Sequence, residues 1–291
     1  MSNLKHFIKD CLIPPKILEV FLSGKVYLKN TLMNSENKRL LADNHLLKNR
    51  HTGCRCFILG AGSSIKNQDI KKLKGEFVIS VSNTFVHPDF AEINPKYHIL
   101  PSLIESHGDT YPEEKFIAWL KAMEASTNNA EMFFHIGDRA MIQKNGLFHN
   151  RILHWFTHAH WNGNFNTPIN LARIPHVWSV SELALTVALY LGFDKIYLIG
   201  IDHDWFNGLF VYFFDHKKEH VIQPDKNNLG NIDSEYQMRR HADIFRKYKY
   251  LYSIKRNIFN ANSNSNHYLD VFPKVDFDSL FESHITKTKK T

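Results

Sequence analysis

The segment CFILGAGSSI, residues 56–65, constrains the fold of this chain more than any other part of the sequence. An apolar run rich in β-forming residues enters a glycine–serine turn and a polar helical pattern follows, which predicts a strand, a tight loop and a helix start. Gly60 and Gly62 permit positive φ and a close approach of the backbone to a ligand. Ser63 or Ser64 can cap the next helix, whose free N–H groups favour an anion. The segment therefore predicts a seat for the phosphate of a nucleotide.

Two familiar nucleotide-binding motifs are incomplete in this loop. Ile65 stands where the dinucleotide fingerprint would have its third glycine, and no Walker-type lysine follows. NAD-dependent and P-loop chemistry are therefore disfavoured. A helix entry that binds no ligand remains the alternative interpretation.

The composition fits one large α/β domain with extensions, because 43% of the 291 residues are hydrophobic. The 36 basic and 29 acidic residues give a net charge of +7, which suits an anionic nucleotide, an acidic glycan or an anionic membrane face. The basic residues are spread out and form no recognised nucleic-acid-binding module, so no nucleic-acid partner is expected. Cys54 and Cys56 are poorly placed to pair with each other, and with Cys11 the count is odd, which indicates a reducing cytosol.

The two ends of the sequence are basic. Residues 4–32 alternate apolar side chains with lysines and predict one or two short amphipathic helices broken at Pro14 and Pro15. With the C-terminal KTKKT they could rest on the inner face of a membrane, and an arm packed on the body is the alternative. No apolar run approaches the length of a membrane span, and no cleavage site follows the start of the sequence. We therefore expect a cytoplasmic protein. Peripheral association with the membrane and formation of an oligomer are both left open.

Strand and helix patterns alternate through the middle of the chain. Runs rich in Ile, Val, Phe and Tyr predict strands at residues 56–59, 77–81, 97–100, 131–136, 195–199 and 257–260. Helical patterns cover residues 66–74 before Gly75, residues 181–191 before Gly192, and residues 234–252. The alternation predicts an α/β fold with a Rossmann-like, mostly parallel sheet flanked by helices.

The predicted organisation has three parts. Residues 1–50 form a basic helical extension, residues 51–281 a Rossmann-like nucleotide-binding catalytic domain, and residues 282–291 a basic tail. Residues 137–178 break the alternation with histidine and tryptophan among Asn, Gly and Pro. We interpret this segment as an insertion that forms a lid or an acceptor-binding subdomain.

Ligands of an open α/β sheet bind at the carboxyl ends of its strands, and polar residues follow five of the predicted strands. Their convergence on one edge predicts a binding site there. The residues in question are Gly60, Ala61, Gly62, Ser63 and Ser64; Ser82, Asn83 and Thr84; Pro101 and Ser102; Asp202, His203 and Asp204; and Asn260, Asn262, Ser263 and Ser265.

These residues also carry a family resemblance. The order GAGSS, then Asn83, then LALTVALYLGFDKIYLIGID and YFFD resembles bacterial sialyltransferases that use CMP-sialic acid on a single Rossmann-like domain. The same core looks like the wider group of 6-hydroxymethylpterin diphosphokinase-like and flagellin-glycosylation-associated proteins, through residues 260–265 and the closing VDFDSLF. The resemblance covers about residues 50–281. It implies transfer of a nonulosonic or related acidic sugar from a CMP-activated donor to a surface-glycan or glycolipid acceptor, without a cofactor.

The resemblance also implies roles for individual residues. Residues 60–64 would seat the CMP phosphate and ribose, Asn83 would hydrogen-bond the nucleotide, and Ser179 and Ser181 would line the same site. Tyr212 of YFFD would stabilise the leaving phosphate. Two positions depart from the family pattern, since Ala61 and Leu100 stand where the family has asparagine.

Transfer from a CMP-activated sugar needs a base that deprotonates the acceptor hydroxyl, and imidazole suits that task near neutral pH. His241 and His216 are the first candidates for this base, and His203 is the next. His220 also lies on the polar segment after YFFD.

No metal site is predicted, although two sequence patterns imitate one. Asp202, His203 and Asp204 imitate a DxD motif that could hold Mg²⁺ or Mn²⁺, but a monophosphate donor has less need of a cation, so Asp202 is expected to be a structural residue or a donor contact. His154 and His158, with His160, could bind zinc if they lay on a helix. The alternatives left open are a pterin-type diphosphokinase that uses ATP and Mg²⁺, and a non-catalytic nucleotide-binding module of a glycan assembly complex.

Overall fold

The protein was studied as a computed structural model, which describes residues 31–107, 111–127, 129–159, 169–175, 177–203, 212–214, 234–262 and 269–282, together with Ile17, Gly24 and Leu28. The structure has a seven-stranded sheet in the order β5-β4-β3-β2-β1-β8-β9, and every neighbouring pair in it is parallel. The strands are β1 (Arg55–Leu59), β2 (Phe77–Val81), β3 (Tyr97–Ile99), β4 (Glu131–His135), β5 (Leu153–Phe156), β8 (Lys195–Ile199) and β9 (Ile258–Asn260).

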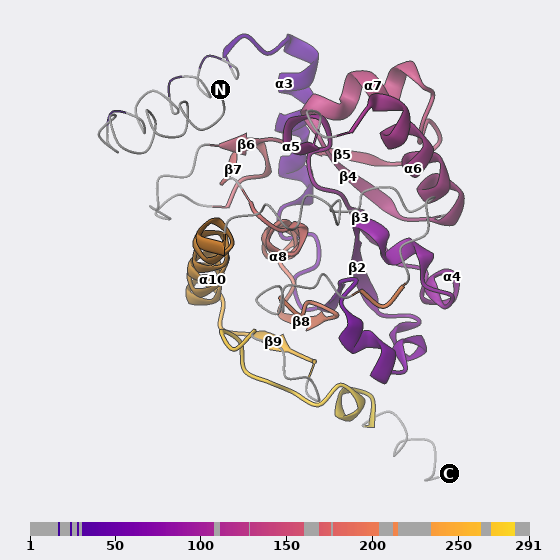
Figure 1. The fold of residues 1–291 in the computed structure, drawn as a ribbon, viewed down its shortest axis with the longest axis vertical. Helices are drawn as coiled ribbons and strands as arrows, with labels where there is room; N and C mark the ends of the chain where they lie inside the picture. Colours follow the sequence, from indigo (N-terminus) through magenta and orange to yellow (C-terminus); the bar gives the residue numbers. More distant parts are fainter. Residues whose placement is uncertain are drawn as a thin grey trace.

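Helices cover both faces of the sheet (Figure 1). The helices α8 and α10 lie on one side of it, and α4, α6 and α7 lie on the other. The α-helices are α3 (Ser35–Ala42), α4 (Phe90–Ile93), α5 (Ile104–His107), α6 (Glu113–Ser126), α7 (Arg139–Lys144), α8 (Val180–Leu191) and α10 (Ser234–Ile254). Short 3₁₀ helices are η2 (Asp43–Leu47), η3 (Ser63–Asn67), η4 (Ile70–Leu73), η5 (Ser82–Val86), η6 (Ile136–Asp138), η7 (Leu171–Arg173) and η9 (Asp278–Leu280). The predicted α/β, Rossmann-like architecture is confirmed.

The central strand β1 explains why both faces need cover. Cys56 and Ile58 are buried in the cluster that contains α8 and α10, whereas Phe57 and Leu59 are buried in a cluster on the opposite face. A strand buried on both faces is apolar throughout instead of alternating, which is why the sequence shows a continuous apolar run at this position.

The helix α8 is the element whose ends the sequence marks most clearly. The Ser179 side chain accepts a hydrogen bond from the N–H of Ser181, and the Glu182 carboxylate accepts the N–H of Ser179 at 2.7 Å, which together form a capping box. Gly192 ends the helix with φ of +82°, a conformation that favours glycine. The helix predicted at residues 181–191 is confirmed.

The single helix predicted at residues 66–74 is wrong. The chain forms the two 3₁₀ helices η3 and η4 instead, separated at Gln68, whose backbone is extended. The Gln68 side chain donates to the carbonyl of Ala261 at 2.7 Å, in the loop after β9. This cross-link holds Gln68 out of a helical conformation. Gly75 still follows the segment at φ of +83°.

The predicted insertion at residues 137–178 is partly corrected. Residues 153–156 form β5, an edge strand of the main sheet that pairs with β4, and Trp155 and Phe156 are buried. Two further short strands, β6 (His158–Ala159) and β7 (Ile174–Pro175), pair with each other outside the main sheet. The lid or acceptor-binding role of this segment stays a prediction.

The described part of the predicted N-terminal extension belongs to the body of the protein. Leu41 and Leu47 are buried, and the Asn44 side chain donates to the carbonyl of Trp155 in β5 at 2.7 Å. Most of the amphipathic region at residues 4–32 and all of the tail after Glu282 lie outside the described residues.

Candidate functional site

The sheet order places the reversal point of the fold between β1 and β8. The chain moves outward from β1 through β2, β3, β4 and β5, and then returns to place β8 on the other side of β1. In doubly wound folds, ligands bind outside the carboxyl ends of the strands at this reversal point. Two segments lie there, which we call the glycine loop (residues 60–64, after β1) and the β8 loop (residues 200–203).

The glycine loop and the β8 loop are joined by hydrogen bonds. The N–H of Gly62 donates to the carbonyl of Gly200 at 2.7 Å. The buried Asp202 carboxylate accepts the N–H of Ser64 at 3.0 Å and the Ser64 hydroxyl at 2.5 Å. The Asn262 amide, in the loop after β9, accepts the N–H of Gly200 at 2.8 Å and donates to Asp202 Oδ1 at 3.4 Å. Loops after three adjacent strands therefore meet at one carboxylate.

The glycines of this loop serve a different purpose from the predicted one. Gly62 has a φ of −65°, and neither Gly60 nor Gly62 has a positive φ. A Cβ at Gly62 would lie 2.7 Å from the carbonyl oxygen of Gly200, and one at Gly60 would lie 2.9 Å from its carbonyl carbon. Glycine is required because the two loops pack backbone to backbone.

The predicted phosphate seat is also corrected in its details. The helix that follows the loop is the five-residue 3₁₀ helix η3, and no serine side chain caps its start. The N–H groups of Gly60, Gly62 and Ser64 donate to Ile199, Gly200 and Asp202 respectively. The Asp202 carboxylate thus takes the place at the helix start that was predicted for a phosphate.

Tyr212 lies beside the glycine loop, 148 positions or more along the chain from its residues. Tyr212 and Gly62 form an isolated antiparallel bridge, and the N–H of Phe213 donates to the carbonyl of Ala61 at 3.1 Å. The Tyr212 ring stacks on Phe214, with centroids 5.4 Å apart. The structure therefore brings residues 212–214 of the YFFD segment to the loop with which the sequence associated it.

His203 is held in a buried group of hydroxyls. Its Nε2 lies 2.8 Å from the Tyr248 hydroxyl, which lies 2.8 Å from the Ser181 hydroxyl. Ser181 in turn lies 2.6 Å from the Ser179 hydroxyl at the start of α8. His203 has a φ of +49°, uncommon for a residue other than glycine. Burial, with the nearby His241 and Arg240, lowers the pKa of His203 to about 3.

His241 is also buried, at 1% exposure, on α10. Burial and the neighbouring Arg240 guanidinium lower the pKa of His241 to about 4, so its imidazole is neutral at pH 7. His216, the other leading candidate for the base, lies outside the described residues, as do His220 and Asp204.

A buried ion pair lies between α8 and α10. Lys247 Nζ is 3.4 Å from Glu182 Oε1, and both side chains are less than 5% exposed. Burial raises the pKa of Glu182 and lowers that of Lys247, and each partner opposes the shift of the other. The pair links the start of α8 to α10.

Two other predicted nucleotide contacts lie farther along the edge. Asn83 follows β2, and its side-chain oxygen accepts the Trp119 indole N–H at 2.6 Å. Ser102 follows β3, is 1% exposed, and its hydroxyl has no hydrogen-bond partner among the residues that the structure describes. β3 lies two strands, about 10 Å, from β1, the strand that leads into the glycine loop.

The helix on which a zinc site at His154, His158 and His160 would depend is absent at the two of these residues that the structure describes. His154 lies in β5 and His158 in β6, so helical spacing does not bring them together. His154 Nε2 is instead 2.7 Å from the buried Glu131, which Lys96 and Arg50 also approach, at 2.7 and 2.9 Å. Within the described ranges, no group of three or more His, Cys, Asp and Glu side chains is arranged to hold a metal ion.

Several residues of the site were missed from the sequence. Tyr248 and Lys247 lie on α10, and Glu182 is the third residue after Ser179 on α8. The S-x-x-E pattern could have identified Glu182 as a cap. Tyr248 follows His241 by seven residues, the spacing of one helix face, but no local pattern indicates what that face contacts.

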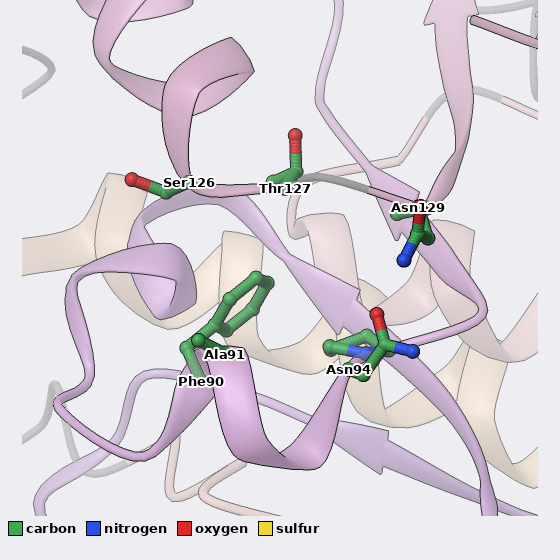
Figure 2. Close-up of a pocket in the computed structure, with 8 residues that line it drawn as sticks. Phe90, Ala91, Asn94, Ser126, Thr127 and Asn129 are labelled. Atoms are coloured by element: carbon green, nitrogen blue, oxygen red, sulfur yellow. The ribbon is translucent and has the colours of Figure 1, made fainter.

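A pocket of about 230 Å³ lies at the opposite edge of the sheet (Figure 2). Asn94 and Pro95 precede β3, and Asn129 and Ala130 precede β4, so the pocket is at the amino ends of these strands. Phe90 of α4 and Ser126 of α6 also line it. Its position separates it from the reversal point, where a ligand of this fold is expected.

Known proteins resemble this chain in structure and not in sequence. No protein-family model matches the chain, and no curated protein matches it in sequence. Across the helices that the structure describes, none is both long and apolar enough to cross a membrane. The fold is similar to that of the sialyltransferase CstII from Campylobacter jejuni, solved in complex with a substrate analogue, cytidine-5'-monophosphate. The two chains are 17% identical, the match covers 77% of this chain and 85% of that one, and the TM-score is 0.41.

Proposed function

We propose that this protein is a glycosyltransferase that moves a nonulosonic, sialic-acid-like or related acidic sugar from a CMP-activated donor to a hydroxyl of a surface-glycan or glycolipid acceptor. The observation that supports this proposal most is the position of Tyr212. The Tyr212 backbone bridges to Gly62 of the glycine loop, at the reversal point of the sheet, where the motifs that resemble CMP-dependent enzymes also lie.

The proposed reaction is a direct displacement with inversion. The acceptor oxygen bonds to the anomeric carbon of the donor while the bond from that carbon to the phosphate oxygen breaks, and the electron pair leaves with CMP. The acceptor proton passes to an imidazole. Tyr212 donates a hydrogen bond to the departing phosphate, on which negative charge develops.

The base is assigned to His241, with His203 next among the described histidines. Both imidazoles are neutral at pH 7, because burial lowers the pKa of each far below 6.5. A neutral imidazole can accept a proton, although one with so low a pKa is a weaker base than the sequence led us to expect. Both residues are at most 4% exposed, so an acceptor can reach either ring only if the side chains that cover it move aside.

The nucleotide is proposed to contact the outer side of the glycine loop. Gly60, Gly62 and Ser64 use their N–H groups within the protein, so the contribution of the loop is a close backbone surface instead of an N–H cradle. Asp202 acts through Ser64 by holding the loop in place. The net charge of +7 favours the anionic donor.

The test is a ligand panel on the full chain, with CMP, CDP, UDP, and ATP with Mg²⁺. A ligand at 100 times its dissociation constant should stabilise the fold by about 2.7 kcal/mol. We expect CMP to do so in the presence of EDTA, and mass spectrometry to detect CMP and a glycosylated acceptor after incubation with a CMP-sugar panel.

The other outcomes identify other functions. Stabilisation by ATP with Mg²⁺ and not by CMP would favour the diphosphokinase alternative, which no feature of the described residues singles out. Binding of CMP with no transfer to any acceptor would favour the non-catalytic module. A chain that responds to none of the four ligands would refute the proposal.

A further inference from the structure

Tyr248 occupies a position where the fold would ordinarily place an apolar residue. The residues of α10 that face the core are spaced at three and four positions, and Ile244 and Leu251 on this face are buried in the main cluster. Tyr248 lies between them and is fully buried. A buried hydroxyl costs free energy unless it is hydrogen-bonded. A tyrosine is therefore tolerated at this position because its hydroxyl has hydrogen-bond partners.

The partners of the Tyr248 hydroxyl come from two different elements. His203 Nε2, from the β8 loop, lies 2.8 Å away, and the Ser181 hydroxyl, from the first turn of α8, also lies 2.8 Å away. The Tyr248 ring packs edge-on against both His203 and Phe272, with centroids 5.4 and 5.3 Å apart. One fixed ring therefore presents its hydroxyl to a loop and to a helix start.

A hydroxyl has one proton, so through the two 2.8 Å contacts of Tyr248 the donors can run in two directions, and the Ser181 hydroxyl also lies 3.4 Å from His203 Nε2. In the first, Ser181 donates to Tyr248, and Tyr248 donates to His203, which then carries its proton on Nδ1. In the second, His203 donates from Nε2 to Tyr248, and Tyr248 donates to Ser181. Burial raises the pKa of Tyr248 well above its usual value, which keeps the phenol protonated in either case.

We propose that Tyr248 is a positioning residue, which fixes the orientation and tautomer of the His203 imidazole and couples them to the hydroxyls of Ser181 and Ser179 at the start of α8. Its effect on donor binding rests on the proposed function and on the role that the family resemblance implies for Ser179 and Ser181, which is to line the nucleotide site. A ligand that takes or gives a hydrogen bond at Ser179 or Ser181 then changes the tautomer of His203 through Tyr248.

The first experiment needs no ligand. Long-range ¹H–¹⁵N NMR spectra of the full chain labelled at histidine report which ring nitrogen carries the proton, and His203→Asn identifies the signal by its loss. We expect one neutral tautomer at pH 7 in the wild type and a mixture of two in Tyr248→Phe, which keeps the ring and removes the hydroxyl. Tyr252→Phe is the matched control, since Tyr252 packs on the same Phe272 ring from one turn further along α10, and its spectrum should be unchanged.

The second experiment measures CMP binding by calorimetry. We expect Tyr248→Phe and Ser181→Ala each to raise the dissociation constant about tenfold, and the double variant to raise it no further, because both changes break the same chain. CMP should shift the His203 signals in the wild type and not in Tyr248→Phe.

The outcomes separate this inference from the proposed function. His203 signals that are the same in Tyr248→Phe and in the wild type would overturn it. If the wild type does not bind CMP, the proposed function fails and the tautomer measurement alone decides the role of Tyr248. If CMP binds equally to the wild type and the variant, the coupling to the donor is overturned. Should Tyr248→Phe not fold, Ser181→Ala carries the tautomer test.

Discussion

The contact between the glycine loop and the β8 loop leads to a sharp prediction for Gly62→Ala. The φ of Gly62 is −65°, a value that alanine adopts freely, so the change introduces no backbone strain. Its new methyl group, however, would lie 2.5 Å from Asp202 Cγ and 2.7 Å from the carbonyl oxygen of Gly200. The whole cost of the substitution must therefore come from pushing the two loops apart.

The size of this cost follows from the distances. Ordinary van der Waals contact begins near 3.4 Å, so the β8 loop must move by about 0.7 Å or more. Such a movement stretches the 2.7 Å hydrogen bond from Gly62 to Gly200 and disturbs the bonds from Ser64 to Asp202. Overpacking of this kind costs about 1–3 kcal/mol, and each kcal/mol lowers the midpoint of thermal unfolding by about 2–4 °C.

The assay is urea unfolding followed by circular dichroism, with CMP binding measured on the folded variant. Gly146→Ala is the control: Gly146 has a φ of +63° and nothing within 4 Å of its missing Cβ, so that change tests backbone strain without a clash. We expect Gly62→Ala to lose both stability and the response to CMP, and Gly146→Ala to lose stability alone. A Gly62→Ala protein as stable as the wild type would refute the close packing of the two loops, and undiminished CMP affinity would remove the glycine loop from the proposed site.

Three further predictions concern single side chains. Burial alone would raise the pKa of Glu131, but hydrogen bonds from His154 and Lys96 outweigh it and lower the pKa from 4.5 to about 2. The stabilisation is therefore complete above pH 4.5 and is lost as the pH falls through 2, so the free energy of unfolding should drop by about 3 kcal/mol over this window, and Glu131→Gln should abolish that component. Tyr212→Phe should lower turnover by about ten- to a hundredfold with little change in melting temperature, whereas unchanged turnover would leave Tyr212 a packing role. If His241 is the base, the rate should fall as the pH drops through about 4, where the imidazole becomes protonated, and His241→Ala should bind CMP without transferring sugar; a limb near 6.5, or full activity in the variant, would contradict the assignment.

Much of the fold could be predicted because its signals are local. The strands β2 and β8 have the predicted bounds, and α8 begins and ends within one residue of its prediction. Apolar runs, the Ser179 cap and the C-terminal glycine each act over a few residues, so the sequence displays them directly. Where a distant contact overrides the local pattern, as the Gln68 amide does by bonding Ala261, the prediction of a single helix fails.

The candidate site divides in the same way. The sequence indicated which loops follow strands, and hence placed residues 60–64, Asn83, Ser102 and Asp202 on one edge of the sheet. It could not indicate that Asp202 accepts both donors of Ser64, since the two residues are 138 positions apart. Nor could it show how deeply His203 and His241 are buried, which is what moves their pKa values away from neutrality.

By itself, then, the sequence determined six of the seven strands of the sheet, the helices α8 and α10, and the edge of the sheet where polar residues gather, because propensity, capping and periodicity depend on neighbours along the chain. The tertiary structure alone decided the strand order, which sets the reversal point between β1 and β8. It also decided why the glycine loop needs glycine: Gly200 and Asp202 leave no room for a Cβ there, and neither glycine has a positive φ. These features arise from contacts between segments more than a hundred residues apart, and such contacts form only once the sheet has brought the segments together.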